Sequence, residues 1–252
     1  MIRSNAPHGP IHYPDLAEPW RSYLARFLRF CEAVPIDSKE IGATRLILLS
    51  SQRYLIEEIF WGLSLGFHDF VIVKARQLGA SSILWALDLW WLMTFPGLQG
   101  MYITDDEGNK ETHRGYISDM YTGLLQSKPS LTRGPWRANN RYELRWPSQP
   151  GWRASRLMWA FVNRRAEGRL GISRGVNVVH GTEIDTWDDE EGVAALQASL
   201  ADRHPRRLYL WEGTGRGYGL LYRFWEQAES STTTRRIFVA FWRRDDYVVS
   251  RD

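Results

Sequence analysis

Apolar residues along this chain switch between a helical and a strand-like spacing. Those between Trp20 and Phe30 recur every three or four positions, which predicts an amphipathic helix, and a second helix is expected from Ser51 to about Leu65. Short apolar runs then alternate with longer periodic segments. The expected strands are Phe70–Lys74, Gly100–Thr104, Arg156–Val162, Val176–Gly181, Leu208–Glu212 and Arg236–Phe241. The expected helices between them are Ser81–Phe95, Glu107–Leu125, Glu190–Ala201 and Gly219–Ala228.

This alternation predicts an α/β fold with a mostly parallel sheet flanked by helices on both faces. Ligands of such sheets bind beyond the carboxyl ends of the strands, so the residues that follow each strand are candidates for chemistry. Residues 1–13 are expected to be a poorly ordered lead. Residues 127–151, which contain four prolines, are expected to form a long excursion with a β-pair around Tyr142–Trp146.

The composition is that of a globular protein with nearly balanced charge. The 252 residues include 32 basic and 29 acidic side chains, so no overall positive field points to nucleic acid. The single cysteine, Cys31, excludes an internal disulfide and a site built from several cysteines, and it fits a reducing compartment. The N-terminus lacks an apolar signal core and no apolar run reaches 18 residues, so we expect neither export nor a membrane span.

The segment from Phe70 to Ser82 contains the clearest sign of a ligand site. An apolar strand breaks into a basic turn with a glycine, and the turn opens directly into a helix. Backbone N–H groups and the positive end of a helix dipole converge there, and Lys74 and Arg76 would suit a polyphosphate that carries Mg²⁺. The usual phosphate-loop pattern, G-x-x-x-x-G-K-[ST], is not met, because Ala80 stands where its Lys would be. An ordinary strand–turn–helix connection fits this segment equally well.

Further strand ends carry groups suited to nucleotide hydrolysis, which needs a metal ligand and a base. Glu183 can serve as the base, whereas Thr182 offers the metal only a hydroxyl, directly or through water. Thr214 lies in a glycine-rich turn after the strand Leu208–Glu212, in a position to sense a terminal phosphate. Gln52 opens a helix from which an amide can read an adenine edge. Taken singly, these residues also fit a surface ion pair, a plain loop and a solvent-facing amide.

Two other polar features are assigned structural roles. The acids Asp188–Glu191 are expected to complement the positive N-terminus of the next helix rather than to bind a metal. His180 has no partner at metal-ligand spacing and is expected to be an oriented residue that supports the site and does not bind a metal.

Four of these segments, in this order, resemble the ATPase domain of the terminase large subunit, the motor that packages DNA into tailed-phage capsids. Lys74–Ser82 resembles the variant Walker A motif of the family, and His180–Trp187 its Walker B segment. Glu212–Trp225 is similar to the coupling motif, and Phe241–Tyr247 to the segment that follows it. The resemblance runs from about Gln52 to Tyr247. It implies a P-loop NTPase fold of the RecA-like (ASCE) class.

The resemblance also implies ATP and Mg²⁺ as ligands and a role for each candidate residue. The residues expected to bind the nucleotide are Gln52, Lys74, Arg76, Gln77, Gly79, Ala80, Ser81, Ser82 and Thr214. The catalytic residues would be Glu183, Lys74 and Arg76, and the metal contacts Ser81 and Thr182. An arginine that reaches the nucleotide of a neighbouring subunit would be Arg169 or Arg174.

The resemblance further implies double-stranded DNA, a homo-oligomeric ring on the capsid portal and the small terminase subunit as partners, in the host cytoplasm. Residues 1–50 would pack as a lead and helix on an ATPase domain of residues 51–252, without the nuclease domain that the family usually adds. Ala80 and Thr182 depart from the family pattern. They keep open a second hypothesis, a nucleotide- or DNA-binding assembly module with little hydrolysis, and a helicase-like ATPase is a weaker third.

Overall fold

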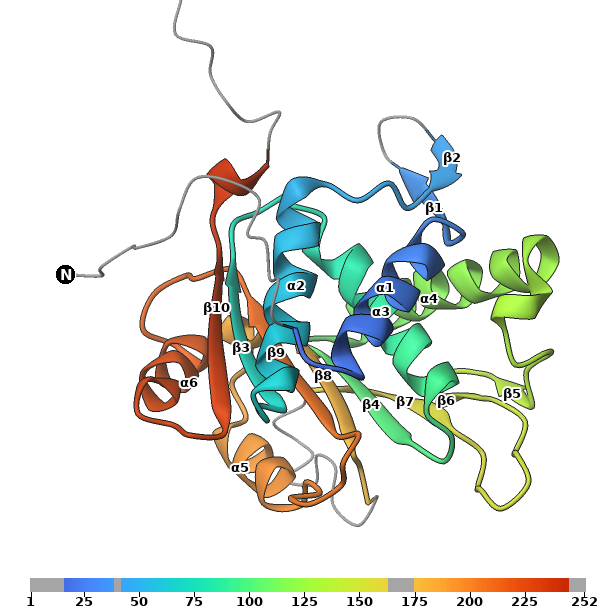
Figure 1. The fold of residues 1–252 in the computed structure, drawn as a ribbon. Helices are drawn as coiled ribbons and strands as arrows, with labels where there is room; N and C mark the ends of the chain where they lie inside the picture. The colour runs from blue at the N-terminus through green and yellow to red at the C-terminus, as the bar shows by residue number, and fades with distance from the viewer. Residues whose placement is uncertain (1–15, 39–41, 163–174, 245–252) are drawn as a thin grey trace, which may run out of the picture.

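Strand segments rich in Val, Ile, Leu and aromatic residues gather into an eight-stranded sheet (Figure 1). The computed structural model describes residues 16–38, 42–162 and 175–244. In sheet order the strands are β10 (Thr234–Val239), β3 (Asp69–Lys74), β9 (Leu208–Gly213), β8 (Val178–Thr182), β4 (Gln99–Thr104), β7 (Arg156–Phe161), β6 (Glu143–Arg145) and β5 (Ala138–Asn139). Neighbours from β10 to β7 are parallel, and β6 and β5 continue the sheet antiparallel. The carboxyl ends of the parallel strands therefore meet at one edge.

Helices cover both faces of the sheet (Figure 1). On one face lie α1 (Trp20–Cys31), α2 (Ser50–Ser64), α3 (Ala80–Thr94) and α4 (Glu107–Ser127), and on the other α5 (Glu190–Ala198) and α6 (Leu220–Glu229). Strand β3 shows how the alternation of side chains divides the core. Phe70 and Ile72 pack with the first set of helices, whereas Val71 packs with the second.

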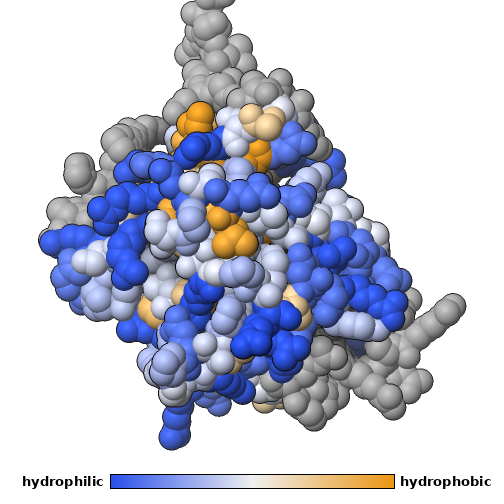
Figure 2. Space-filling model, turned by 90° about the vertical axis from the view of Figure 1, so that its right-hand side faces the viewer, coloured by the Kyte–Doolittle hydropathy of each residue, from blue (hydrophilic) through white to orange (hydrophobic). Residues whose placement is uncertain are grey.

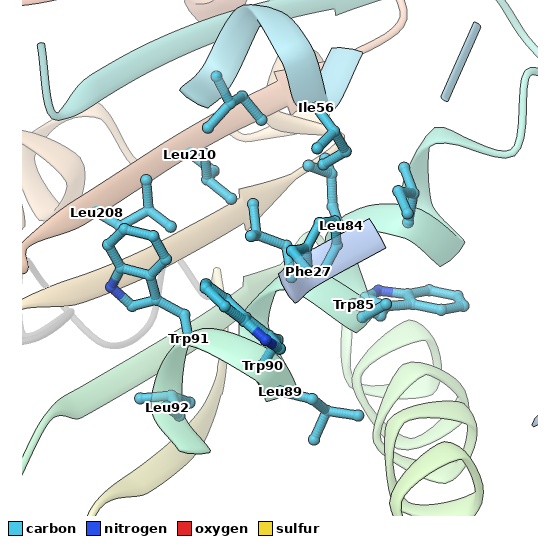
Figure 3. Packing of buried hydrophobic residues seen from close by; sticks show 14 of the residues in the cluster. Phe27, Ile56, Leu84, Trp85, Leu89, Trp90, Trp91, Leu92, Leu208 and Leu210 are labelled. Atoms are coloured by element: carbon cyan, nitrogen blue, oxygen red, sulfur yellow. The ribbon is translucent and has the colours of Figure 1, made fainter. Parts of the chain in front are cut away.

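Helix α3 is apolar around its whole circumference and lies at the centre of the larger core. Its residues Trp90 and Trp91 point into a cluster with Phe27 of α1 and the β9 residues Leu208 and Leu210 (Figure 3). The ring centroid of Phe27 lies 5.6 Å from that of Trp90, in an edge-on arrangement. Buried aromatic rings contribute more apolar area than any other side chains, so these contacts attach α1 firmly to the sheet-covering helices.

The helices and strands expected from the sequence are all present, with ends shifted by a few residues. The largest shift is in α5, which ends at Ala198 and not at Ala201. The last strand, β10, ends at Val239, and Phe241–Arg243 form a 3₁₀ turn, η4, instead of continuing the strand. A hairpin of β1 (Pro35–Ser38) and β2 (Gly42–Arg45) was not expected. The lead of residues 1–13 and the arginines Arg169 and Arg174 lie outside the described residues.

The acids before α5 have the structural role expected of them. Asp189 is the N-cap residue, and its Oδ1 accepts a hydrogen bond of 2.9 Å from the backbone N–H of Gly192. Glu190 and Glu191 lie in the first turn, where negative charge is stabilised by the helix dipole.

Polar side chains dominate the face of the molecule that carries α4 and the β1–β2 hairpin, with apolar residues in small separate spots (Figure 2). Among the helices of the described ranges, none is both long and apolar enough to span a bilayer.

Candidate active site

The turn between β3 and α3 forms a pocket of about 210 Å³. It is lined by Lys74, Ala75, Gln77, Leu78, Gly79, Ala80, Ser81 and Ser82. Gly79 precedes the first residue of α3 and has a φ of +67°, which strongly favours glycine. The first backbone N–H groups of a helix have no partner within that helix, so this pocket suits an anion such as a phosphate.

Gln52 braces this turn from α2. The side chain is buried, its Oε1 accepts a hydrogen bond of 2.9 Å from the Leu49 N–H, and its Nε2 donates one of 2.8 Å to the Gly79 carbonyl. A Cβ at position 79 would lie 2.5 Å from Gln52 Nε2. Both ends of the amide therefore have partners in the protein, and contact with an adenine edge would require Gln52 to release Gly79.

Lys74, the last residue of β3, lies between two carboxylates. Its Nζ is 2.8 Å from Glu183 Oε1 and 3.0 Å from Glu212 Oε2. Lys74 is 8% exposed and Glu212, near the end of β9, is fully buried. Burial opposes the charged form of Lys74, but Glu212 and Glu183 outweigh it and raise the pKa of Lys74 above its usual range. The cation and the candidate base are thus brought together at the edge that the parallel strands predict.

A second buried ion pair, between His180 and Asp88, adjoins the cluster of Lys74, Glu183 and Glu212. His180 Nδ1 on β8 is 2.6 Å from Asp88 Oδ2 on α3, and both side chains are fully buried. Burial disfavours the charged histidine, but Asp88 raises the pKa of His180 to about 9. Burial raises the pKa of Asp88 as well, so both shifts favour keeping a proton on the pair at neutral pH. His180 is thus oriented by Asp88 beside the candidate base, and its part in the site stays a prediction.

These two ion pairs meet at Glu212. Its Oε1 accepts a hydrogen bond from the Thr182 hydroxyl and lies 3.9 Å from His180 Nε2. Burial alone would raise the pKa of Glu212, but Lys74 and then His180 outweigh it and lower that pKa to about 2. Thr182 is 1% exposed. The donated hydrogen bond leaves the lone pairs of the hydroxyl oxygen available to a metal, but this burial means that the oxygen would first have to be uncovered.

Glu183 follows β8 in a left-handed conformation, with a φ of +51°. Such a φ is costly for a residue with a side chain and is found where the surrounding structure enforces it, often at functional sites. Glu183 is 26% exposed, and its Oε2 lies 3.5 Å from Arg216 Nη2. One oxygen of the candidate base thus accepts a hydrogen bond from the buried Lys74, whereas the other makes only the longer ion-pair contact with an arginine nearer to the solvent.

Of the other expected residues, Gln77, Ser81 and Ser82 line the pocket, whereas Arg76 and Thr214 are not among its lining residues. Arg76 and Gln77 are exposed on the turn, and the Gln77 carbonyl accepts a hydrogen bond of 2.7 Å from Arg244 Nη1. Ser81 and Ser82 are half-buried in the first turn of α3, and Thr214 is half-buried just after β9. Those assignments stay predictions.

Three residues of the site were not singled out as functional from the sequence: Asp88, Glu212 and Arg216. Asp88 was visible as a charge within the apolar run Leu84–Phe95, and a buried charge in such a helix requires a partner. Glu212 was visible as a carboxylate at the end of an apolar strand. Arg216 had no comparable signal, because arginine is common in this chain.

Comparison with known proteins rests on structure alone, because no protein-family model and no curated protein sequence matches the chain. The ATPase domain of the Thermus phage P74-26 large terminase matches with a TM-score of 0.55 and 15% identity, over 69% of this chain and 76% of that one. The fold is that of a large terminase ATPase domain. The expected α/β architecture, a mostly parallel sheet flanked by helices, and the resemblance to terminase ATPase domains are thereby confirmed at the level of fold.

Two longer terminases share this fold. The HK97 bacteriophage large terminase gives a TM-score of 0.58 at 14% identity and covers 85% of this chain. A large terminase from a thermophilic bacteriophage gives 0.57 at 10% identity and covers 81%. This chain spans 43% and 48% of those two proteins. The thermophilic-phage terminase has also been solved in complex with ADP, with a TM-score of 0.50 to this chain.

Proposed function

We propose that this chain is an ATP-hydrolysing motor domain of viral genome packaging, which translocates double-stranded DNA into a procapsid. The observation that carries the proposal is the juxtaposition of Lys74 and Glu183 beside the pocket at the start of α3. A cation for phosphate charge and a carboxylate to polarise water are the groups that phosphoryl transfer to water requires. The terminase fold and the ADP complex of the thermophilic-phage terminase support the same conclusion.

The residues of the site divide the work. Lys74, Arg76 and the backbone N–H groups from Gly79 to Ser82 would hold the phosphates of ATP, and Ser81 the metal. Mg²⁺, when bound, supplies positive charge to the phosphate oxygens. Glu183 would orient and deprotonate the attacking water. The buried Glu212 keeps Lys74 charged and in place, because its own pKa is far below neutrality.

The partners follow from the same proposal. The domain would act on double-stranded DNA as a homo-oligomeric ring on a capsid portal, together with a small terminase subunit, in the host cytoplasm. Residues 51–252 would form the motor domain, with the N-terminal helix packed on it. An arginine from a neighbouring subunit would complete the site, and Arg169 and Arg174 are the candidates.

One observation favours a second candidate, an assembly module that binds nucleotide or DNA with little hydrolysis. The Thr182 hydroxyl donates its hydrogen bond to Glu212, and Ala80 leaves the helix start without its usual lysine. Thr182 is 1% exposed and Ala80 carries no charge, so neither position presents a charged group to the pocket.

ATP turnover with and without double-stranded DNA separates the two candidates. We expect Mg²⁺-dependent hydrolysis that DNA stimulates, and a fall of about 10²-fold or more in kcat for Glu183→Gln, with nucleotide binding retained. Glu229→Gln is the matched control, because this glutamate is 64% exposed on α6. Binding without turnover in the parent would favour the assembly module. Equal rates in parent and Glu183→Gln would show that the base lies elsewhere.

Lys74→Ala is a less direct test than it looks from the sequence. The substitution removes a phosphate-binding cation, but it also leaves the buried carboxylate of Glu212 without its closest cation. A loss of ATP affinity in that variant would therefore combine a local effect with a loss of stability.

A further inference from the structure

Arg216 lies between the candidate base and the loop that follows β9. Its Nη2 is 3.5 Å from Glu183 Oε2, and its Nε is 3.3 Å from Asp185 Oδ2. The other oxygen of Glu183, Oε1, is 2.8 Å from Lys74 Nζ. Glu183 is therefore held between two cations, one from the end of β3 and one from the loop after β9.

This loop, residues 214–219, is packed against the segment that carries Glu183. A Cβ on Gly213, just before the loop, would lie within 2.4 Å of Asp185 Oδ1, and one on Gly215 would lie 3.7 Å from Val73 of β3. The loop therefore runs over the end of β3, beside the pocket. Glycines at positions 215, 217 and 219 let the loop backbone adopt conformations that side chains would hinder. Arg216 is the only charged residue of the loop.

The two cations differ in how firmly they are held. Lys74 is 8% exposed and pairs with a fully buried carboxylate, whereas Arg216 is 47% exposed. An ion pair near the surface contributes little net free energy, so a stronger anion readily takes the place of its carboxylate. Phosphate is such an anion, because its oxygens match the planar fork of a guanidinium.

We propose that Arg216 is the positioning residue through which the loop after β9 responds to the terminal phosphate of a bound nucleoside triphosphate. The inference rests on the proposed function and deepens it. Arg216 exchanges Glu183 for the phosphate, which removes the guanidinium beside Glu183 Oε2 and lets a water molecule donate a hydrogen bond to that oxygen, while Lys74 keeps Oε1 in place. The sequence predicts that Thr214 senses the terminal phosphate. Arg216 adds a positive charge to the same loop and an ion pair with the candidate base, Glu183.

The test compares the affinities of ADP and of a non-hydrolysable ATP analogue, both with Mg²⁺, by calorimetry. We expect the parent to bind the analogue more tightly than ADP. Arg216→Ala should weaken analogue binding by about tenfold or more and leave ADP binding within about twofold, because one charge-assisted contact is lost. Arg216→Lys should recover part of the difference. The matched control is Arg145→Ala, since Arg145 is 49% exposed, pairs with Glu143 and lies on β6, outside the segment that resembles the coupling motif.

Hydrogen exchange of the amides of residues 214–219 gives a readout that does not depend on turnover. The analogue, but not ADP, should change their exchange in the parent, and Arg216→Ala should abolish that difference. If Arg216→Ala keeps the preference for the analogue, or loses affinity for both nucleotides equally, the role assigned to Arg216 is wrong and the proposed function stands. If the parent binds neither nucleotide, the proposed function fails and this inference with it.

Discussion

Strand β3 has an ionisable residue at each end, and the two ends are opposite in electrostatic character. At the amino end, the Asp69 carboxylate accepts hydrogen bonds of 2.8 Å from Trp211 Nε1 and 3.3 Å from Thr234 Oγ1, and burial raises its pKa to about 6. At the carboxyl end, the neighbouring Glu212 is more deeply buried, yet its pKa is about 2. The difference is Lys74, because neutral donors offset part of the desolvation of an acid, whereas a buried cation reverses it.

Each end also adjoins a pocket, and the two pockets are similar in size. The one beside Asp69 has a volume of about 150 Å³ and that beside Lys74 about 210 Å³. Only the second combines the start of a helix with a buried cation. The charge pattern, and not the volume, therefore identifies the candidate nucleotide site.

The largest effect is expected from Glu212→Gln. The substitution keeps the shape of the side chain but replaces the fully buried carboxylate partner of Lys74 with an amide, while the pair with the more exposed Glu183 remains. The free energy of unfolding at pH 7 should fall by about 3–5 kcal/mol, the usual cost of breaking a buried ion pair. Urea denaturation measures it. Glu229→Gln, in an exposed pair, should change the value by less than about 1 kcal/mol. If both variants lower the free energy of unfolding by similarly small amounts, the stabilising role assigned to the Lys74–Glu212 pair at the carboxyl end of β3 is wrong.

Asp69→Asn should have the opposite sign at neutral pH. The pKa of Asp69 in the folded state, about 6, lies above that of an unfolded aspartate, about 3.9. The folded state thus binds the proton more tightly, and its stability falls as the pH rises from about 4 to above 6. At pH 7 the variant should be more stable than the parent by about 1–3 kcal/mol. Near pH 4 this gain should vanish.

Unfolding curves of the parent and Asp69→Asn at pH 4, 5.5 and 7 provide the check. The difference between the two proteins cancels the contributions of the other titrating groups. A variant that is less stable than the parent by the same amount at every pH would mean that Asp69 is needed for its hydrogen bonds and is not strained by burial.

The sequence predicts the sheet well because the signal for its strands is local. Apolar runs such as Phe70–Lys74 and Leu208–Glu212 are buried on both faces, and helices of matching period separate them. The β1–β2 hairpin has no such signal, since its strands Pro35–Ser38 and Gly42–Arg45 are short and mix polar with apolar residues. Its pairing depends on contacts that four-residue patterns do not encode.

The site is predicted in part for a related reason. Strand order brings Lys74 and Glu183 to one edge, and a parallel sheet implies that meeting without any knowledge of side chains. The pairing of His180 with Asp88 joins residues 92 positions apart on a strand and a helix, so its geometry follows only from the packed structure. The pKa of His180 is raised because its partner Asp88 outweighs burial, and which partner a buried charge has is not readable from its neighbours in sequence.

The smallest effect is expected from Ala80→Lys, which adds the lysine of the usual phosphate loop. Ala80 is 4% exposed at the first position of α3, beside the pocket whose cation is already Lys74. A second ammonium would meet like charge near the same phosphates, so kcat should rise by less than about tenfold, or fall.

Ala80→Met is the matched control, because methionine is similarly long and carries no charge. A rise of about tenfold, equivalent to about 1.4 kcal/mol of transition-state stabilisation, that the Met variant does not share would mean that Lys74 does not fill the phosphate-binding role. In that case neither end of β3 would supply a cation to a bound ligand. The assembly module would then describe the chain better than the motor.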